Sequence, residues 1–331
     1  MNARLRRPAV LSRRCFLLAP GALSLSAPLR AQPRFPERAI SLLVPFAPGG
    51  IADLTARAVA EHMGKALGQP VVVENKPSAG SIVATQAVAT ARPDGHTLLL
   101  MSNGNAVSVG LFKKLPFDVQ KDFAPITTLG FFDIGVFVAA HSKFATLQQA
   151  LSHARAHPSK LNVGTIAPGS TQHLAAKLFE TVAGADMLVV PYKGSPAVLT
   201  ALRSGEVDLA FEIVGPMVPQ VAAGVVRALA VSSDKRNPAL PEVPTVMQAG
   251  VAGYNVASWN ALAAPAGTPP EVIDRLGRAA REAVASAEVQ ARLAKLGMRL
   301  HGSTPAELQA LMASEIQRWS AVIRAARIDP E

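Results

Sequence analysis

The residue type in shortest supply is cysteine: the 331-residue sequence contains only Cys15. Cys15 lies in an N-terminal stretch that we expect to be removed from the mature protein. A mature chain without cysteine forms no disulfide bond and carries out no thiol chemistry. Both are therefore excluded as explanations of how this protein is stabilised and what it does.

Long nonpolar runs are also missing. No such run within residues 32–331 reaches the length of a membrane span, so we expect this part of the chain to be soluble. Charged residues make up 17% of the sequence and hydrophobic residues 49%, which is typical of a globular protein. The length is sufficient for two lobes.

Acidic residues are absent from residues 1–31, and this absence distorts the net charge. The formal charge is +10, but six of the 33 basic residues are arginines in 1–31. The remaining 27 basic and 23 acidic residues leave the rest of the chain at about +4. This small excess gives no support to a nucleic-acid partner.

Residues 1–31 have the features of an export signal. An arginine-rich start is followed by a nonpolar stretch and a candidate cleavage site after Ala31. The sequence "SRRCFL" at 12–17 resembles a twin-arginine signal, and a general secretory signal is the alternative. We therefore expect a protein of bacterial type that is exported to the periplasm by a cleaved signal.

The remaining sequence alternates strand and helix patterns. Such βαβ alternation predicts an α/β fold with mostly parallel sheets covered by helices. The chain ends instead in two or three helices, and two capping-box sequences, beginning at Thr268 and Thr304, predict where helices start. The predicted strands are 39–46, 70–75, 96–102, 134–140, 161–166, 188–193, 209–214, 226–233 and 256–265, and the predicted helices between them are 53–67, 80–91, 146–157, 170–183, 195–204 and 215–223.

The nonpolar faces of the closing helices need a sheet to pack against. The nearest sheet that still has an uncovered face is that of the first lobe. This arrangement predicts two α/β lobes, with the chain crossing near 128–133 and returning near 252–257. The first lobe is then 32–130 plus 255–331, and the second is 131–254. A cleft between two lobes is a common place for a ligand.

Several strand-to-helix junctions end in glycine or small polar residues. They occur in "VPFAPGGIAD" (44–53), "VGTIAPGSTQH" (163–173), "VVPYKGSPAV" (189–198) and "MSNGNAVS" (101–108). The carboxyl ends of parallel strands meet at one edge, where unpaired amides at helix starts attract anions. We therefore predict that Gly49 and Gly50 expose amides that bind a carboxylate. Taken alone, each junction is explained by ordinary chain geometry, because glycine at strand ends and small polar residues at helix starts are common. Asp53 taken alone is an acid in the first turn of a helix, where the helix dipole favours it.

Other chemistry is weakly represented. The sequence lacks the glycine pattern of a nucleotide-binding loop and a nucleophile elbow, and we expect no cofactor and no catalysis. His153 and His157 have the spacing of metal ligands but lack the glutamate of H-E-x-x-H, so we expect no metal. Lys193 is expected to be solvated or to contact an anion rather than to form a Schiff base. Nothing in the sequence requires more than a monomer.

The chain after residue 36 resembles the Bug family, the TctC-like substrate-binding receptors of tripartite tricarboxylate transporters. The segments that carry this resemblance are "VPFAPGGIAD", "VVVENKPSAGS", "ARPDGHTLL", "LPFDVQKDFAPI", "GTIAPGSTQHLAAKLF", "VPYKGSPAVLTALRSGEVDLAF", "RALAVSSDKRNPALPEVPTVMQAG" and "WNALAAPAGTPPEVI". The resemblance implies a type II periplasmic-binding-protein fold that closes on a small carboxylated ligand. It also implies partnership with the membrane permease subunits of such a transporter.

The same resemblance implies a set of ligand-binding residues. In the first lobe these are Phe46, Ala47, Gly49, Gly50 and Asp53. In the second lobe they are Thr165, Ser170, Thr171, Tyr192, Lys193 and Gly194. Phe46 would form a wall of the pocket, while hydroxyl groups and amides would bind oxygen atoms.

Four departures from the family pattern bear on the ligand. Ile51 and Ala52 replace a small hydroxyl pair, and Ser78 and Ser81 stand where glycines are common. Asn103 and Asn105 lie near the position of a usual histidine, and we count Asn103 among the binding residues. Glu212 replaces a shorter or neutral residue. Facing the cleft, Glu212 would disfavour a ligand with several carboxylates and favour one with an amine; otherwise it points to solvent or pairs with a base.

Two other functions remain open at this stage. The binding protein would be a sensor or scavenger if it had no dedicated permease. Alternatively, the chain is an exported α/β hydrolase built around Ser170 and His173. The hydrolase would lose turnover on Ser170→Ala, whereas a receptor would show altered binding and no turnover.

Overall fold

The computed structural model describes residues 35–168, 170–325, 328 and 330. The predicted export signal at 1–31 lies outside these residues. Within them the strands form two half-sheets that share one long strand. In the described part of the chain, no helix combines the length and the nonpolar character needed to span a membrane.

The first half-sheet has the strand order β2-β1-β3-β9-β4, with β10 also paired to β4. The first three strands are parallel, whereas β9 is antiparallel to both β3 and β4. These strands are β1 (Ile40–Val44), β2 (Val71–Asn75), β3 (Thr97–Ser102), β4 (Phe123–Ala139), β9 (Ala257–Pro265) and β10 (Arg299–Leu300). The first helices of this half of the chain are α1 (Ile51–Leu67), the 3-10 turn η1 (Ala79–Ser81), α2 (Ile82–Ala89) and α3 (Asn103–Leu111).

The second half-sheet joins the last part of β4 to β7, β5 and β6, and β8 also pairs with β4. The pairs β5–β6 and β5–β7 are parallel. These strands are β5 (Asn162–Ile166), β6 (Leu188–Tyr192), β7 (Leu209–Ile213) and β8 (Val226–Val231). Its helices are α4 (Leu147–Ala156), α5 (Thr171–Ala183), α6 (Ser195–Ser204) and α7 (Val214–Ala222).

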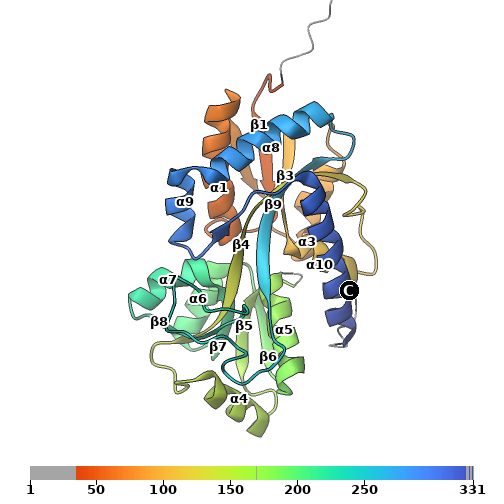
Figure 1. Ribbon diagram of the computed structural model, residues 1–331. Helices are drawn as coiled ribbons and strands as arrows, with labels where there is room; N and C mark the ends of the chain where they lie inside the picture. The colour runs from red at the N-terminus through yellow and green to blue at the C-terminus, as the bar shows by residue number, and fades with distance from the viewer. Residues whose placement is uncertain (1–34, 169, 326–327, 329, 331) are drawn as a thin grey trace, which may run out of the picture. The chain divides into compact units, whose positions relative to one another are not determined.

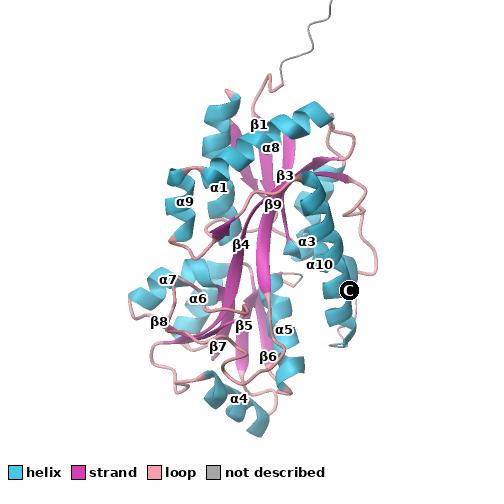
Figure 2. Cartoon of the chain, viewed as in Figure 1, coloured by secondary structure: helices cyan, strands magenta, loops and turns pink. Residues whose placement is uncertain are grey.

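Strand β4 links the two half-sheets without a break. Its residues 123–133 pair with β9, and its residues 134–139 pair with β7 and β8. Figure 1 shows β4 and β9 running side by side between the two sets of helices. Figure 2 shows that helices cover the strands of each half-sheet on more than one side.

The chain closes with α8 (Pro270–Ala285), α9 (Ala287–Ala294) and α10 (Pro305–Ala325). Helix α8 packs on α1 and α10 packs on α3, so the closing helices cover the first half-sheet, as predicted. The capping box at Thr304 is confirmed, because Thr304 and Glu307 exchange hydrogen bonds. The one predicted at Thr268 is wrong: α8 begins after Pro269 without a side-chain cap, and Thr268 donates to the Pro265 carbonyl.

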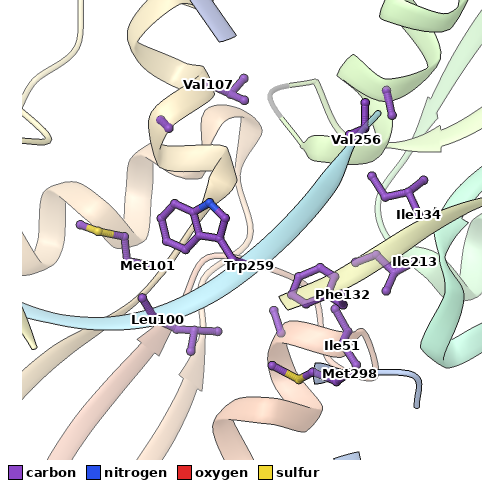
Figure 3. Close-up of a cluster of buried hydrophobic side chains, with 14 of the residues drawn as sticks. Ile51, Leu100, Met101, Val107, Phe132, Ile134, Ile213, Val256, Trp259 and Met298 are labelled. Atoms are coloured by element: carbon purple, nitrogen blue, oxygen red, sulfur yellow. The ribbon is translucent and has the colours of Figure 1, made fainter. Parts of the chain in front are cut away.

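The hydrophobic core extends from the first half-sheet toward the second. Figure 3 shows Trp259 of β9 beside Met101 of β3, below Val107 of α3. The same figure shows Phe132 of β4 close to Ile51 of α1 and Met298. All of these side chains are buried, and burial of this much nonpolar surface is the main term that stabilises the fold.

The two-lobe α/β fold is as predicted, and each predicted strand has a counterpart. Three details differ: the sheets are mixed rather than mostly parallel, β4 begins at Phe123 instead of residue 134, and α3 follows β3 directly. Proline and two threonines at 125–128 masked the start of β4. The predicted lobe limits, 130/131 and 254/255, remain a prediction.

Candidate ligand-binding site

A cavity of about 510 Å³ lies where the two half-sheets meet. Its walls come from the β1–α1 loop, the η1 turn and the middle of β4 and β9, together with the β5–α5 and β6–α6 loops. Loops at the carboxyl ends of strands from both half-sheets therefore face one space. A cavity of this volume is within the range of small-molecule sites.

Of the residues predicted in the first lobe, Phe46, Ala47 and Gly50 line the cavity. Gly49 and Asp53 do not, and they bind each other: the Gly49 amide donates to Asp53 Oδ2 at 3.0 Å. The prediction that the Gly49 amide is exposed for a carboxylate is therefore wrong. Gly49 has a φ of +84°, so glycine is required there by the turn.

Asp53 is a structural carboxylate in this arrangement. Its Oδ1 accepts a hydrogen bond of 3.0 Å from Arg57, one helical turn further along α1. Burial alone would raise the pKa of Asp53, but the hydrogen bonds from Arg57 and Gly49 and the charge of Arg57 together hold that pKa below its ordinary value. Asp53 thus stays ionised and fixes the β1–α1 loop instead of contacting a ligand.

Of the residues predicted in the second lobe, Ser170, Thr171, Lys193 and Gly194 line the cavity. Tyr192 does not, because its hydroxyl donates to Glu206 at 2.8 Å. Burial, and then this bond and the charge of Glu206, raise the pKa of Tyr192 to about 12. This contact lies within the second half of the molecule, and a ligand contact of Tyr192 remains a prediction.

Thr165 is the other predicted residue that lies behind the wall. Its hydroxyl contacts Nδ1 of His173 at 3.1 Å and donates to the Ile166 carbonyl. Burial, and then the charge of Lys177, lower the pKa of His173 to about 4. His173 is therefore a neutral imidazole at neutral pH.

Four of the helices that begin at the cavity, α1, α2, α6 and α7, have no side-chain cap, and glycine precedes two of them. Gly50 precedes α1 and Gly194 precedes α6, and neither helix start receives a side-chain hydrogen bond from the described residues. Serine, threonine or aspartate normally supplies that bond. Uncapped amides at the positive end of a helix dipole bind anions. This is the strongest feature of the site for holding a carboxylate.

The helix starts of α1 and α6, both preceded by glycine, lie close together. A Cβ atom placed on Gly50 would be 4.0 Å from Ser195 Oγ, and one placed on Gly194 would be 3.1 Å from the Ala47 side chain. Glycine at 194 therefore allows the β6–α6 loop to approach the β1–α1 loop. The amides of α1 and α6 converge on a single region of the cavity.

A chain of polar side chains crosses the cavity. The Asn103 amide at the start of α3 donates to the Thr171 hydroxyl at 3.2 Å, and that hydroxyl is 2.9 Å from the one of Ser258 on β9. A second bridge joins the backbones, because the Gly80 amide donates to the Pro168 carbonyl at 3.2 Å. Asn103 itself does not line the cavity; it contacts Thr171, which does.

Asn260 has an unusual position on β9. It lines the cavity and is buried, yet neither its amide nitrogen nor its amide oxygen has a hydrogen-bond partner among the described residues. Buried polar groups without partners are rare and costly. Asn260 is therefore available to a guest that offers a donor or an acceptor.

Glu212 lies directly behind the cavity wall. Ser195 and Ile213, which both line the cavity, donate to Glu212 Oε2 at 2.9 and 3.0 Å. Glu212 Oε1 has no partner among the described residues. The predicted alternatives, exposure to solvent or pairing with a base, are both wrong, because the side chain is fully buried and has no basic partner.

The pKa of Glu212 reflects this burial. Burial raises the pKa of the carboxyl group to about 7, although the hydrogen bonds from Ser195 and Ile213 act in the opposite direction. Glu212 therefore changes charge near neutral pH. Any charged group that enters the cavity beside Ser195 will influence its ionisation.

The residues proposed for other chemistry serve structural purposes. Ser170 Oγ caps α5 by accepting a bond from the backbone amide of His173, not from its ring, so the Ser170–His173 pair has no catalytic geometry. The rings of His153 and His157 stack with centroids 4.5 Å apart. Among the described residues, no three acidic, histidine or cysteine side chains gather as a metal site would require.

Sequence reasoning missed several lining residues, chiefly Phe132, Gln172, Ser195, Ser258 and Asn260. A signal for two of them was present. Ser258 and Asn260 alternate in an otherwise nonpolar strand, and alternate residues of a strand share one face. Two polar residues on the same face of a buried strand indicate a polar surface there.

Comparisons with known proteins agree with this geometry. The sequence model of the tripartite tricarboxylate transporter family receptors, TctC, matches residues 55–328. A UPF0065 protein from the tcbD-tcbE intergenic region of Pseudomonas sp. strain P51 is 37% identical over 290 residues, which cover 87% of this chain and 86% of the relative.

Solved structures align over similar lengths. The periplasmic binding protein BugD is 31% identical with a TM-score of 0.86, covering 90% of this chain and all of BugD. MatC from Rhodopseudomonas palustris with bound malate is 34% identical with a TM-score of 0.83. The alignment covers 87% of this chain and all of the MatC chain. R. palustris Rpa4515 with adipate is 33% identical with a TM-score of 0.86, covering 90% and 100%.

Proposed function

Because the chain belongs to the family of tripartite tricarboxylate transporter receptors, we propose that it is a periplasmic solute-binding protein. It captures a small organic acid or amino acid through a carboxylate and delivers this ligand to the permease subunits of a tripartite tricarboxylate transporter. It acts as a monomer and catalyses no reaction. The signal at 1–31, of the twin-arginine type, directs it to the periplasm.

One observation carries this proposal: the uncapped starts of α1 and α6 converge on a cavity between the half-sheets. Amides at helix starts bind a carboxylate without an arginine, because they combine unpaired N–H groups with the positive end of the dipole. Lys193 at the edge adds one positive charge. The malate and adipate complexes of MatC and Rpa4515 support a carboxylate ligand here as well.

A ligand screen tests this proposal. Thermal unfolding of the purified protein would be measured with mono-, di- and tricarboxylates, amino acids and aromatic acids, together with the neutral amides of the same acids. A ligand at 100 times its Kd should raise the free energy of unfolding by about 2.7 kcal/mol. We expect at least one acid to do so and its amide not to. No response to any acid would overturn the proposal.

Delivery to a permease needs a separate experiment. Deleting the gene in its own bacterium should abolish uptake of the radiolabelled ligand found in the screen, and deletion of the membrane subunits should have the same effect. Uptake that continues in both strains would favour a sensor or scavenger. Turnover of the ligand that is lost on Ser170→Ala would instead favour a hydrolase.

A further inference from the structure

We infer that the ligand of this protein carries one carboxylate on a nonpolar body, rather than two or more carboxylates. This inference rests on the proposed function and names the class of acid that the same cavity accepts. It follows from where the anion-binding groups are, what the rest of the wall is made of, and which ionisable group lies behind it.

The anion-binding groups occupy one place in the cavity. Gly50 and Ser195, at the starts of α1 and α6, are close enough that a Cβ on Gly50 would be 4.0 Å from Ser195 Oγ. Lys193, two residues before Ser195, is the one charged side chain among the described lining residues. These groups form a single site of the size of one carboxylate. The described lining residues offer a second carboxylate no further charged side chain.

The wall beyond this site is largely nonpolar. Ile51, Phe132 and Ile213 line the cavity from α1, β4 and β7. Figure 3 shows these three side chains gathered near one another, and each is almost fully buried. Ile51 reaches across to the second half of the molecule, where its Cδ1 would be 3.2 Å from a Cβ on Gly215. A charged group against this wall would lose its hydration without gaining hydrogen bonds.

The nearest ionisable side chain behind the wall is an acid. Glu212 is fully buried, bonds to Ser195 and Ile213, and has one oxygen without a partner among the described residues. Within the described residues, no lysine, arginine or histidine donates to it. The ionisable group behind the wall therefore supplies no positive charge to balance a second carboxylate.

The remaining polar groups suit an uncharged substituent. Asn260 and the Thr171–Ser258 pair lie on the cavity wall without any formal charge. The unpartnered amide of Asn260 offers one donor and one acceptor. A hydroxyl group on the nonpolar body, which both donates and accepts, would satisfy both sides of the amide, whereas a second carboxylate, which only accepts, would leave the amide oxygen unsatisfied.

Matched pairs of acids test this inference directly. Calorimetry on the purified protein would compare octanoate with octanedioate, cyclohexanecarboxylate with cyclohexane-1,4-dicarboxylate, and phenylacetate with 4-carboxyphenylacetate. We expect the monocarboxylate to bind at least 30-fold more tightly in the best pair. Lactate, which has one carboxylate but almost no nonpolar body, should bind more weakly than that monocarboxylate.

The outcomes separate this inference from the proposed function. Dicarboxylates that bind as tightly as their monocarboxylate partners, or more tightly, would overturn the inference and leave a carboxylate receptor intact. An absence of binding to all acids, mono- and dicarboxylates alike, would overturn both. Equal binding of octanamide and octanoate would show that no carboxylate is required, which also overturns both.

A variant of the nonpolar wall provides the second readout. Ile51→Thr replaces part of that wall by a hydroxyl group, so we expect the best monocarboxylate to bind at least fivefold more weakly. Ile273→Thr, on α8 and outside the cavity, is the matched control for the loss of nonpolar volume and should bind as the unmodified protein does. Unchanged affinity in folded Ile51→Thr protein would contradict the role of this wall.

Discussion

The side-chain amide of Asn103 donates a hydrogen bond of 3.2 Å to the hydroxyl of Thr171, and this bond joins the start of α3 to the start of α5 beside the cavity. Asn103 belongs to the first half of the fold and Thr171 to the second. Asn103 does not line the cavity, so its contribution to binding is separable from direct contact with a ligand.

Asn103→Ala removes this link and should weaken ligand binding about threefold to tenfold. The reason is that one hydrogen bond stabilises the contact between the starts of α3 and α5 by about 1 kcal/mol. Calorimetric Kd values would measure the effect. Asn255→Ala, an exposed asparagine, is the control, and equal Kd values for the two variants would contradict a bridging role for Asn103.

Gly50→Val should weaken the best carboxylate ligand at least tenfold while the protein still folds. Gly50 has a φ of −83°, which valine adopts, and a Cβ there meets no atom closer than 3.9 Å. The added side chain would extend toward Ser195 and block access to the α1 amides. Ala66→Val adds the same branch to the exposed end of α1 and should leave the Kd unchanged. Full affinity in the Gly50 variant would remove this loop from the site.

Glu212→Gln should change how stability depends on pH. In the folded protein burial raises the pKa of Glu212 from 4.5 to about 7. Between these values the folded state holds a proton that the unfolded state has lost, so the native carboxyl lowers the free energy of unfolding as pH rises from 4.5 to 7. The variant has no titrating group at this position and does not lose this stability. Its free energy of unfolding should therefore rise relative to that of the unmodified protein by up to about 3 kcal/mol between pH 4.5 and 7.5.

Urea unfolding at several pH values would measure the difference for Glu212→Gln. Glu242→Gln, on the surface, serves as the control and should show no such gain. A bound carboxylate near Ser195 further favours the protonated form of Glu212. Ligand affinity should therefore fall as pH rises above 7 in the unmodified protein and stay level in the variant; parallel pH profiles would contradict this coupling.

His173→Gln should change how the free energy of unfolding depends on pH below neutrality. Burial lowers the pKa of His173 from 6.5 to about 4, so below pH 6.5 the unfolded state takes up a proton that the folded state does not. This lowers the free energy of unfolding as pH falls from 6.5 to 4. As pH falls across that interval, the free energy of unfolding of the variant should rise relative to that of the unmodified protein by about 3 kcal/mol. The exposed His141→Gln variant is the control, and a constant difference with pH would refute the assignment.

Most of the fold could be predicted from the sequence because its pattern is local. Strands such as β1 and β5 are short nonpolar runs followed by glycine or proline, and the helices between them have nonpolar stripes. The start of β4 escaped prediction because Pro125 and two threonines interrupt the pattern. It forms a strand nonetheless because β9 pairs with it along residues 123–133, which is a long-range contact.

The site was predictable only in part, for a similar reason. The junction glycines Gly50 and Gly194 carry a local signal and do line the cavity. Gly49 and Tyr192 lie at the same junctions but form hydrogen bonds elsewhere. The Gly49 amide donates to Asp53 and the Tyr192 hydroxyl donates to Glu206, and only the folded chain brings these partners together. Phe132 lies on a strand that crosses the molecule, and nothing in its neighbouring sequence indicates a cavity.

The unbroken course of β4 restricts how one half of this protein can move against the other. Between Asp133 and Ile134 the ladder partner changes from β9 to β7, but the backbone stays extended and hydrogen-bonded on both sides of that point. A pivot built from a paired strand bends by changing its twist, not by swinging like a loose linker. We therefore expect any opening of the cavity to change the twist of β4 and β9 and to be opposed by the pairing of these strands.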